Sequence, residues 1–166
     1  MSVVAIRGNY AAVDSQDTIN EHLRLKSQKW RLGKGTDGRG EVCLWTGEAA
    51  LGATLAHWYF KGAKAEDYPA EARVEPMKCR LIVLTIHGDA IAYETSPQAL
   101  LVADEYMAFG TGRDFALGAM ATGRGVITAV EAACRWCITC GGQIHAFEYK
   151  EATGWGIREG EGPNAL

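Results

Sequence analysis

Four side chains near the C-terminal end of the sequence are of the types that bind zinc. Cys134, Cys137 and Cys140 recur at intervals of three residues, and His145 follows five residues later. Structural zinc sites use thiolate sulfur and imidazole nitrogen, so this spacing is compatible with a small binding module held together by a metal ion. However, Cys134 and Cys137 also continue a helical apolar stripe, and Cys140 joins them only if the chain leaves the helix. We therefore favour reduced core thiols with no metal or cofactor, and we keep the zinc module as an alternative.

The composition indicates a single domain without a nucleic-acid or membrane partner. The chain has 166 residues, of which 48% are hydrophobic, enough to fill the core of one domain. Its net charge is -3 and its basic residues are spread along the sequence, so no basic patch is expected. Residues 1–8 do not form a secretory signal and no apolar stretch could span a bilayer, which favours a cytoplasmic protein. Five cysteines, an odd number, then favour free thiols over a disulfide framework.

The elements that would position these side chains alternate between strands and helices. Two apolar runs flank Gly8-Asn9, a pair that suits a tight hairpin turn. The expected strands are residues 3–7, 10–14, 29–32, 41–46, 79–86, 90–94, 106–109 and 138–149, the last broken at Gly141-Gly142. The expected helices are residues 48–62, 113–122 and 126–137. Residues 15–27 and 63–78 are expected to be mainly irregular connections.

This order predicts an α+β domain in which strand hairpins pack on each other and helices lie outside. We expect one domain over residues 1–158 and a flexible tail over residues 159–166.

Three segments are distinctive in this order: residues 2–15, residues 29–32 with residues 44–50, and residues 107–112. Together they resemble the proteasome β-subunit family, particularly its small bacterial and phage relatives of the HslV type. Residues 2–15 resemble the opening hairpin, which begins with the nucleophile and ends its second strand with an aspartate. Lys29-Trp30-Arg31-Leu32, continued at residues 44–50, resembles the lysine strand and the glycine before the first helix. Residues 107–112 are similar to the Gly-Ser-Gly segment that opens the third helix. The resemblance covers about residues 2–145 and implies a four-layer αββα sandwich of antiparallel sheets.

The resemblance implies a threonine- or serine-type peptidase whose nucleophile is the first residue of the processed chain. Such a residue attacks an amide with its side-chain oxygen, while its free α-amine, with an ordinary pKa of about 7.7 to 8, acts as the base. Ser2 would supply both groups once Met1 is removed. If Met1 stays, the hydroxyl has no adjacent free amine.

The same resemblance assigns roles to four further residues. Lys29 would lie beside the nucleophile, where its charge lowers the proton affinity of the hydroxyl and the amine. Asp14 would pair with Lys29 and hold its orientation. Gly47 would donate its backbone N–H to the oxyanion of the tetrahedral intermediate, a contribution of roughly 3 to 4 kcal/mol in other oxyanion holes. Thr111 would hydrogen-bond near the N-terminus in place of the family serine.

One position departs from the family pattern. The family has a further aspartate near the end of its last long helix that supports the terminal amine, and Arg135 occupies the matching place. A cation there would repel a protonated amine. Arg135 and a retained Met1 would both favour an alternative, an inactive structural ring subunit of the same fold.

The resemblance also implies partners. Subunits of the family stack as rings that enclose their sites, so we expect a homo-oligomeric ring that cleaves unfolded polypeptide, with an ATPase unfoldase as a candidate partner. Trp58, Tyr59 and Phe60 form an aromatic group on one helix, which we expect to be exposed for ring contacts, with a core position of Trp58 as the alternative.

Overall fold

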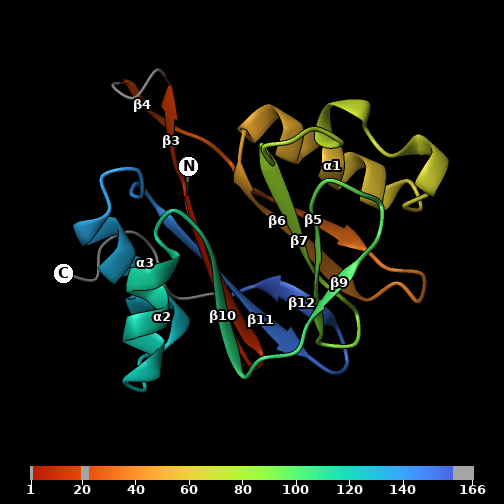
Figure 1. Cartoon of the computed structure of the whole chain (residues 1–166). Helices are drawn as coiled ribbons and strands as arrows, with labels where there is room; N and C mark the ends of the chain where they lie inside the picture. Colours follow the sequence, from red (N-terminus) through yellow and green to blue (C-terminus); the bar gives the residue numbers. More distant parts are fainter. Residues whose placement is uncertain (1, 20–22, 159–166) are drawn as a thin grey trace.

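The fold is built on one large sheet whose two halves pack against each other (Figure 1). The computed structural model describes residues 2–19 and 23–158. One half contains β10 (Tyr106–Gly110), β1 (Val3–Arg7), β2 (Tyr10–Asp14), β11 (Ile144–Lys150) and β12 (Gly154–Ile157), in that order. The other contains β5 (Trp30–Lys34), β6 (Gly40–Gly47), β7 (Cys79–Leu84), β8 (Ala90–Tyr93) and β9 (Leu100–Val102). Neighbours within each half run antiparallel, and one parallel bridge between Gly154 and Gly40 joins the halves.

Helices cover the outer faces of the two halves. The elements outside the main sheet are α1 (Ala49–Phe60), α2 (Arg113–Ala121), α3 (Val126–Trp136), the 3-10 turns η1 (Ala65–Asp67) and η2 (Ala70–Ala72), and the hairpin of β3 (Gln16–Ile19) and β4 (Leu23–Lys26). Figure 1 shows α2 and α3 on one side, α1 on the other, and the β3–β4 hairpin projecting beyond the body of the protein. Among the described residues, no helix combines the length and apolar character needed to cross a membrane.

Strand β1 contributes to two separate hydrophobic clusters. Val3 and Ala5 pack with α2 and α3, whereas Val4 and Ile6 pack in the central cluster between the two halves of the sheet. Successive side chains of a strand point to opposite faces, so a strand covered on both faces is apolar at every position. This explains why residues 3–6 form an unbroken apolar run rather than an alternating one.

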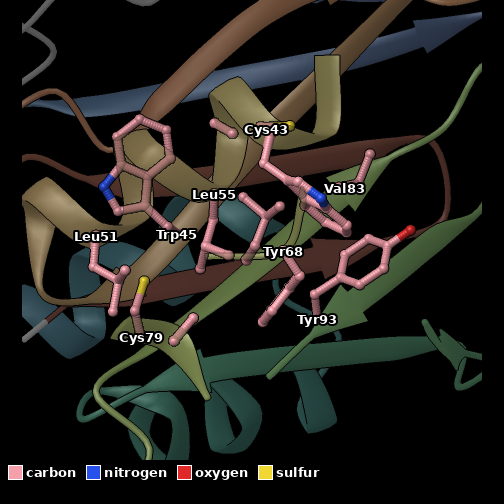
Figure 2. Close-up of a cluster of buried hydrophobic side chains, with 12 residues drawn as sticks. Cys43, Trp45, Leu51, Leu55, Tyr68, Cys79, Val83 and Tyr93 are labelled. Atoms are coloured by element: carbon pink, nitrogen blue, oxygen red, sulfur yellow. The ribbon is translucent and has the colours of Figure 1, made fainter. Parts of the chain in front are cut away.

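Strand β6 divides its side chains in the same way. Val42 and Leu44 face the central cluster, whereas Cys43 and Trp45 face α1. Figure 2 shows the cluster beneath α1, in which Leu51 and Leu55 lie with aromatic and sulfur side chains from the sheet and from the segment after the helix. The labelled members are Cys43, Trp45, Leu51, Leu55, Tyr68, Cys79, Val83 and Tyr93. Each half of the sheet therefore has a helix-covered face and a face turned to the other half.

The aromatic residues at the end of α1 belong to this core. Trp58 is 4% exposed, and its ring meets the edges of Tyr68 and Tyr93 at centroid distances of 4.8 and 5.1 Å. Tyr59 and Phe60 are partly buried against the same cluster. The expectation that these three residues form an exposed surface for ring contacts is therefore wrong, because the aromatic stripe faces the sheet.

Most expected elements are confirmed, and the differences lie in polar or short segments. The hairpin at Gly8-Asn9 is present, with Val4 opposite Val13. Residues 15–27 contain β3 and β4 instead of an irregular connection, and β9 and β12 were not expected. Residues 138–143 form turns and loop, so the last expected strand begins later, at β11. All four side chains of β4 are exposed, and a strand without a buried face has no apolar period to detect. The expected tail at 159–166 lies outside the described residues.

We predict that the central cluster is the main source of stability. Phe147 is fully buried there and contacts Trp30 edge-on at 5.5 Å, so Phe147→Ala is expected to lower the free energy of unfolding by about 3–5 kcal/mol. Phe115 is 43% exposed on α2, and Phe115→Ala is expected to cost less than about 1 kcal/mol. Urea denaturation followed by tryptophan fluorescence measures both. Similar losses of unfolding free energy for the two variants would contradict the placement of Phe147 in the core and of Phe115 at the surface.

Candidate active site

Asp14 and Lys29 form a buried ion pair at one end of the sheet. Their side chains are 0% and 1% exposed, and Lys29 Nζ lies 3.2 Å from Asp14 Oδ1. Lys29 Nζ also donates to the carbonyl oxygen of Gln16. The same Asp14 oxygen accepts the Val3 N–H at 2.9 Å, and Asp14 Oδ2 accepts the Gly141 N–H at 3.0 Å. This carboxylate therefore joins the start of β1, the end of β2 and the loop before β11.

The surroundings of Asp14 shift the pKa of its carboxyl group in opposite directions. Burial raises the pKa of the Asp14 carboxyl above its ordinary value, while the Lys29 charge and the two backbone N–H donors counteract this rise. Lys29 is held on the facing half of the sheet, because its carbonyl oxygen accepts the Trp45 N–H at 3.1 Å. The pair thus links the two halves of the sheet where β2 ends and β5 begins.

Ser2 lies next to this pair and is itself fully buried. Its carbonyl oxygen lies 3.4 Å from the Gly112 nitrogen and 3.5 Å from the Thr111 hydroxyl, which donate to it. Within residues 2–19 and 23–158, Ser2 Oγ has no hydrogen-bond partner, so it is not bonded to the Lys29 ammonium. A buried hydroxyl without a partner is uncommon, because it loses its hydration without replacement, and such groups call for a functional explanation.

Two glycines allow the backbone to close around Ser2. Gly110 has φ +92°, and a Cβ there would lie 2.1 Å from the Ser2 carbonyl oxygen and 3.2 Å from the Thr46 γ-methyl group. Gly47 follows Thr46, has φ +101°, and a Cβ there would lie 2.2 Å from the Lys78 carbonyl oxygen. Side chains at these two positions would be strained and would clash with backbone. The end of β6, with Gly47, therefore approaches the same place as Ser2 and Gly110.

The structure thus brings the five residues selected from the sequence to one end of the sheet. Asp14 and Lys29 are directly paired, Ser2 is attached to Asp14 through the neighbouring Val3 N–H, and Thr111 bonds to the Ser2 carbonyl. Gly47 follows Thr46, whose methyl group would lie 3.2 Å from a Cβ on Gly110.

Sequence reasoning missed three polar residues that extend this site. The Thr139 hydroxyl lies 2.7 Å from the Thr111 hydroxyl and 3.2 Å from Cys137 Sγ. Cys140 Sγ lies 3.9 Å from the Thr111 hydroxyl. The signal available was the sequence Cys-Ile-Thr-Cys directly after an expected helix end. This sequence indicates core thiols or zinc ligands, and it gives no sign of a contact with Thr111.

Arg135 does not take the place expected from the family pattern. Its side chain is exposed, and its guanidinium carbon lies 5.4 Å from the ring centroid of Trp136, which is also exposed. The side chains near Thr111 are instead those of Thr139, which contacts it, and Cys137, which contacts Thr139 just beyond the helix. The predicted repulsion between Arg135 and a terminal amine is therefore not supported by this arrangement.

The alternative of a zinc-stapled module also lacks support in the described part of the chain. No three His, Cys, Asp or Glu side chains there gather closely enough to hold a metal ion. His145 packs on Trp30 with 5.5 Å between ring centroids, and burial lowers its pKa. All five cysteines are free thiols.

Solved structures of two kinds of protein, Anbu and HslV, have a similar fold. A Gly-1 mutant of Anbu from Hyphomicrobium sp. strain MC1 gives a TM-score of 0.71 at 12% identity, covering 95% of this chain and 84% of that chain. Anbu from Yersinia bercovieri, described as an ancestral beta-subunit, gives 0.65 at 11% identity, with coverages of 95% and 86%. Eukaryotic HslV from Trypanosoma brucei gives 0.62 at 18% identity, with coverages of 87% and 96%.

These similarities show the fold class of the chain, an α+β fold of the kind found in Anbu and HslV. No protein-family profile matches the chain, and no curated protein matches its sequence.

We predict that breaking the Asp14–Lys29 pair destabilises the protein strongly. Lys29→Met leaves a buried carboxylate without its cation and is expected to cost about 3–5 kcal/mol of unfolding free energy. The double variant Asp14→Asn/Lys29→Met removes both charges and is expected to cost less than the sum of the single changes. Lys150→Met, which removes the largely exposed partner of Glu148, should cost less than about 1 kcal/mol. Urea denaturation of Asp14→Asn, Lys29→Met, the double variant and Lys150→Met measures these free energies of unfolding. Additive losses for the two single changes would refute the coupling.

We also predict that Gly110 cannot carry a side chain. Gly8→Ala has a comparable positive φ of +54° but open space around the new methyl group, so it should cost only the backbone strain of about 1–2 kcal/mol. Gly110→Ala adds a clash with the Ser2 carbonyl and should cost clearly more. Thermal unfolding compares the two, and equal losses would show that β10 does not approach Ser2 closely.

Proposed function

We propose that the chain is a proteasome-like peptidase subunit that hydrolyses peptide bonds with Ser2 as an N-terminal nucleophile. The observation that carries this proposal is the buried Asp14–Lys29 pair, whose shared oxygen also accepts the N–H of the residue after Ser2. A buried ion pair pays a large desolvation cost and is weak evidence for a purely stabilising role. Its hydrogen bond to the residue after Ser2, whose buried hydroxyl has no partner among the described residues, favours a role in chemistry.

In the proposed reaction, removal of Met1 gives Ser2 a free α-amine next to its hydroxyl. The amine nitrogen accepts the hydroxyl proton while Ser2 Oγ attacks the carbonyl carbon of a peptide bond. The Lys29 charge favours the deprotonated hydroxyl and the neutral amine. We assign the Gly47 N–H to the developing oxyanion and Thr111 to the positioning of the Ser2 backbone. The amine then returns the proton to the leaving nitrogen, and water hydrolyses the resulting ester.

We further propose that the domain is a four-layer αββα sandwich that works in a cytoplasmic homo-oligomeric ring. The three apolar clusters, one under α1, one between the halves of the sheet and one under α2 and α3, support the layers. Free cysteines are consistent with a reducing compartment. Leu23 and Leu25 are 56% and 42% exposed on the projecting β3–β4 hairpin and are candidate ring contacts in place of Trp58. Unfolded polypeptide is the proposed substrate, delivered by an ATPase unfoldase.

The burial of Ser2 favours a second candidate, an inactive structural subunit of the same fold. With 0% of its surface exposed, Ser2 is not accessible to a polypeptide in this form of the chain. If Met1 is retained in the mature protein, the hydroxyl keeps no adjacent amine and the subunit has no reaction to perform.

The test is covalent labelling of the purified full chain with a peptide epoxyketone, which closes a ring on both a hydroxyl and a free amine. Intact mass first shows whether Met1 is removed. We expect a single adduct on Ser2 and none above background in Ser2→Ala, while Ser2→Thr retains it. Ser96→Ala, a change at an exposed serine, should label like the unmodified chain. Two results would favour the inactive subunit instead. The purified chain would retain Met1, or the Ser2→Ala variant would be labelled to the same extent as the unmodified chain.

A further inference from the structure

The turn after α3 brings two cysteines to the same pair of hydroxyl groups. The Cys140 N–H donates to the Cys137 carbonyl oxygen at 3.0 Å. Cys137 Sγ lies 3.2 Å from the Thr139 hydroxyl, and Cys140 Sγ lies 3.9 Å from the Thr111 hydroxyl. A turn closed in this way keeps the first and fourth Cα atoms within about 7 Å, close to the span of a disulfide. The separation of the two Cα atoms therefore meets one geometric requirement of a disulfide between these cysteines.

The two thiols differ in accessibility and acidity. Cys137 is partly exposed between Trp136 and Ile138, which are 65% and 79% exposed, whereas Cys140 is buried. Burial raises the pKa of Cys137, but hydrogen bonds from Thr139, Cys140 and other neighbours outweigh this, so its pKa lies below the ordinary value. Burial raises the pKa of Cys140. This division suits an attacking thiolate and a protected resolving thiol.

The same sulfurs touch the groups that hold Ser2. Thr139 bridges Cys137 Sγ and the Thr111 hydroxyl, and Thr111 donates to the Ser2 carbonyl. Cys140 Sγ would lie only 2.7 Å from a Cβ on Gly112, whose N–H also donates to that carbonyl. A change in the sulfur positions must therefore reach the backbone around Ser2, because no free space separates them.

We propose that Cys137 and Cys140 are a redox site that forms a reversible disulfide and thereby lowers the reactivity of Ser2. The second part of this proposal depends on the proposed function. The oxidant is a small-molecule disulfide. The Cys137 thiolate attacks one sulfur of the oxidant and releases the first small thiolate, leaving a mixed disulfide. Cys140, after losing its proton, attacks Cys137 Sγ and releases the second. The protein thus loses two protons and two electrons, and the oxidant is reduced to two thiols.

The experiment incubates the purified full chain with oxidised glutathione and with dithiothreitol. Peptide mapping after alkylation is expected to show one disulfide, between Cys137 and Cys140, with the other three cysteines alkylated. Cys140→Ala should stop at a glutathione adduct on Cys137, and Cys137→Ala should give neither product. Cys134→Ala changes a thiol one helical turn earlier, whose pKa burial raises to about 12, and should behave like the unmodified chain. No disulfide, or one that requires Cys134, would overturn the redox site.

The effect on Ser2 is read in two ways. Epoxyketone labelling should slow by roughly tenfold to a hundredfold on oxidation, recover with dithiothreitol, and be insensitive to oxidant in Cys137→Ala. Amide hydrogen exchange of residues 110–112 should also differ between the oxidised and reduced chains, whether or not Ser2 is reactive. If the disulfide forms but exchange at 110–112 is unchanged, the coupling is wrong. If exchange changes but the reduced chain never labels, the coupling holds and the proposed peptidase activity fails.

Discussion

A lysine ammonium and an aspartate carboxylate, both withdrawn from water, meet where the two halves of the sheet come together at one end. Each charge loses its hydration there, and the partner charge and backbone groups compensate for that loss. The pair therefore requires that β1, β2, the chain before β5 and the loop before β11 all arrive at fixed positions. Ser2 immediately precedes one of the N–H donors, so its position is set by the same requirement.

Close backbone approach complements this electrostatic constraint. Gly110 and Gly47 lie at the ends of strands from different halves of the sheet, and each has a carbonyl oxygen where a side chain would otherwise be. Because β10 can come so near, Thr111 and Gly112 reach the Ser2 carbonyl, and the turn after α3 closes over them through Thr139. The site is thus built from backbone contacts and short side chains, and little space is left for adjustment. This explains how the Cys137–Cys140 turn could be coupled to Ser2.

The sequence predicted the parts of this arrangement that leave local patterns. The apolar runs of β1 and β7, the Gly8-Asn9 turn and the three helices are confirmed, because buried faces impose a period and turns impose residue types. Asp14 and Lys29 were selected through family resemblance, and no local pattern could show that they pair across the sheet. For Trp58 the sequence left a core position and an exposed position open, because an aromatic stripe looks alike on a core-facing and a partner-facing helix. The β3–β4 hairpin was missed since its side chains bury too little to produce a pattern.

Arg135 and Cys137 show a different limit. Counting residues from a family pattern selected Arg135, whose exposed side chain lies over Trp136. The residue count does not show that Cys137, two positions later, lies 3.2 Å from the Thr139 hydroxyl. Only the three-dimensional course of the chain after Trp136 distinguishes the two.

We propose that the buried Asp14–Lys29 pair serves the chemistry of Ser2. The decisive measurement is the rate of epoxyketone labelling in Asp14→Asn/Lys29→Met, compared with the unmodified chain after both are shown to be folded and to lack Met1. If the pair serves this chemistry, the variant with the uncharged pair keeps its fold but is labelled at least about a hundredfold more slowly. Labelling at the rate of the unmodified chain would mean that Lys29 and Asp14 only support the fold.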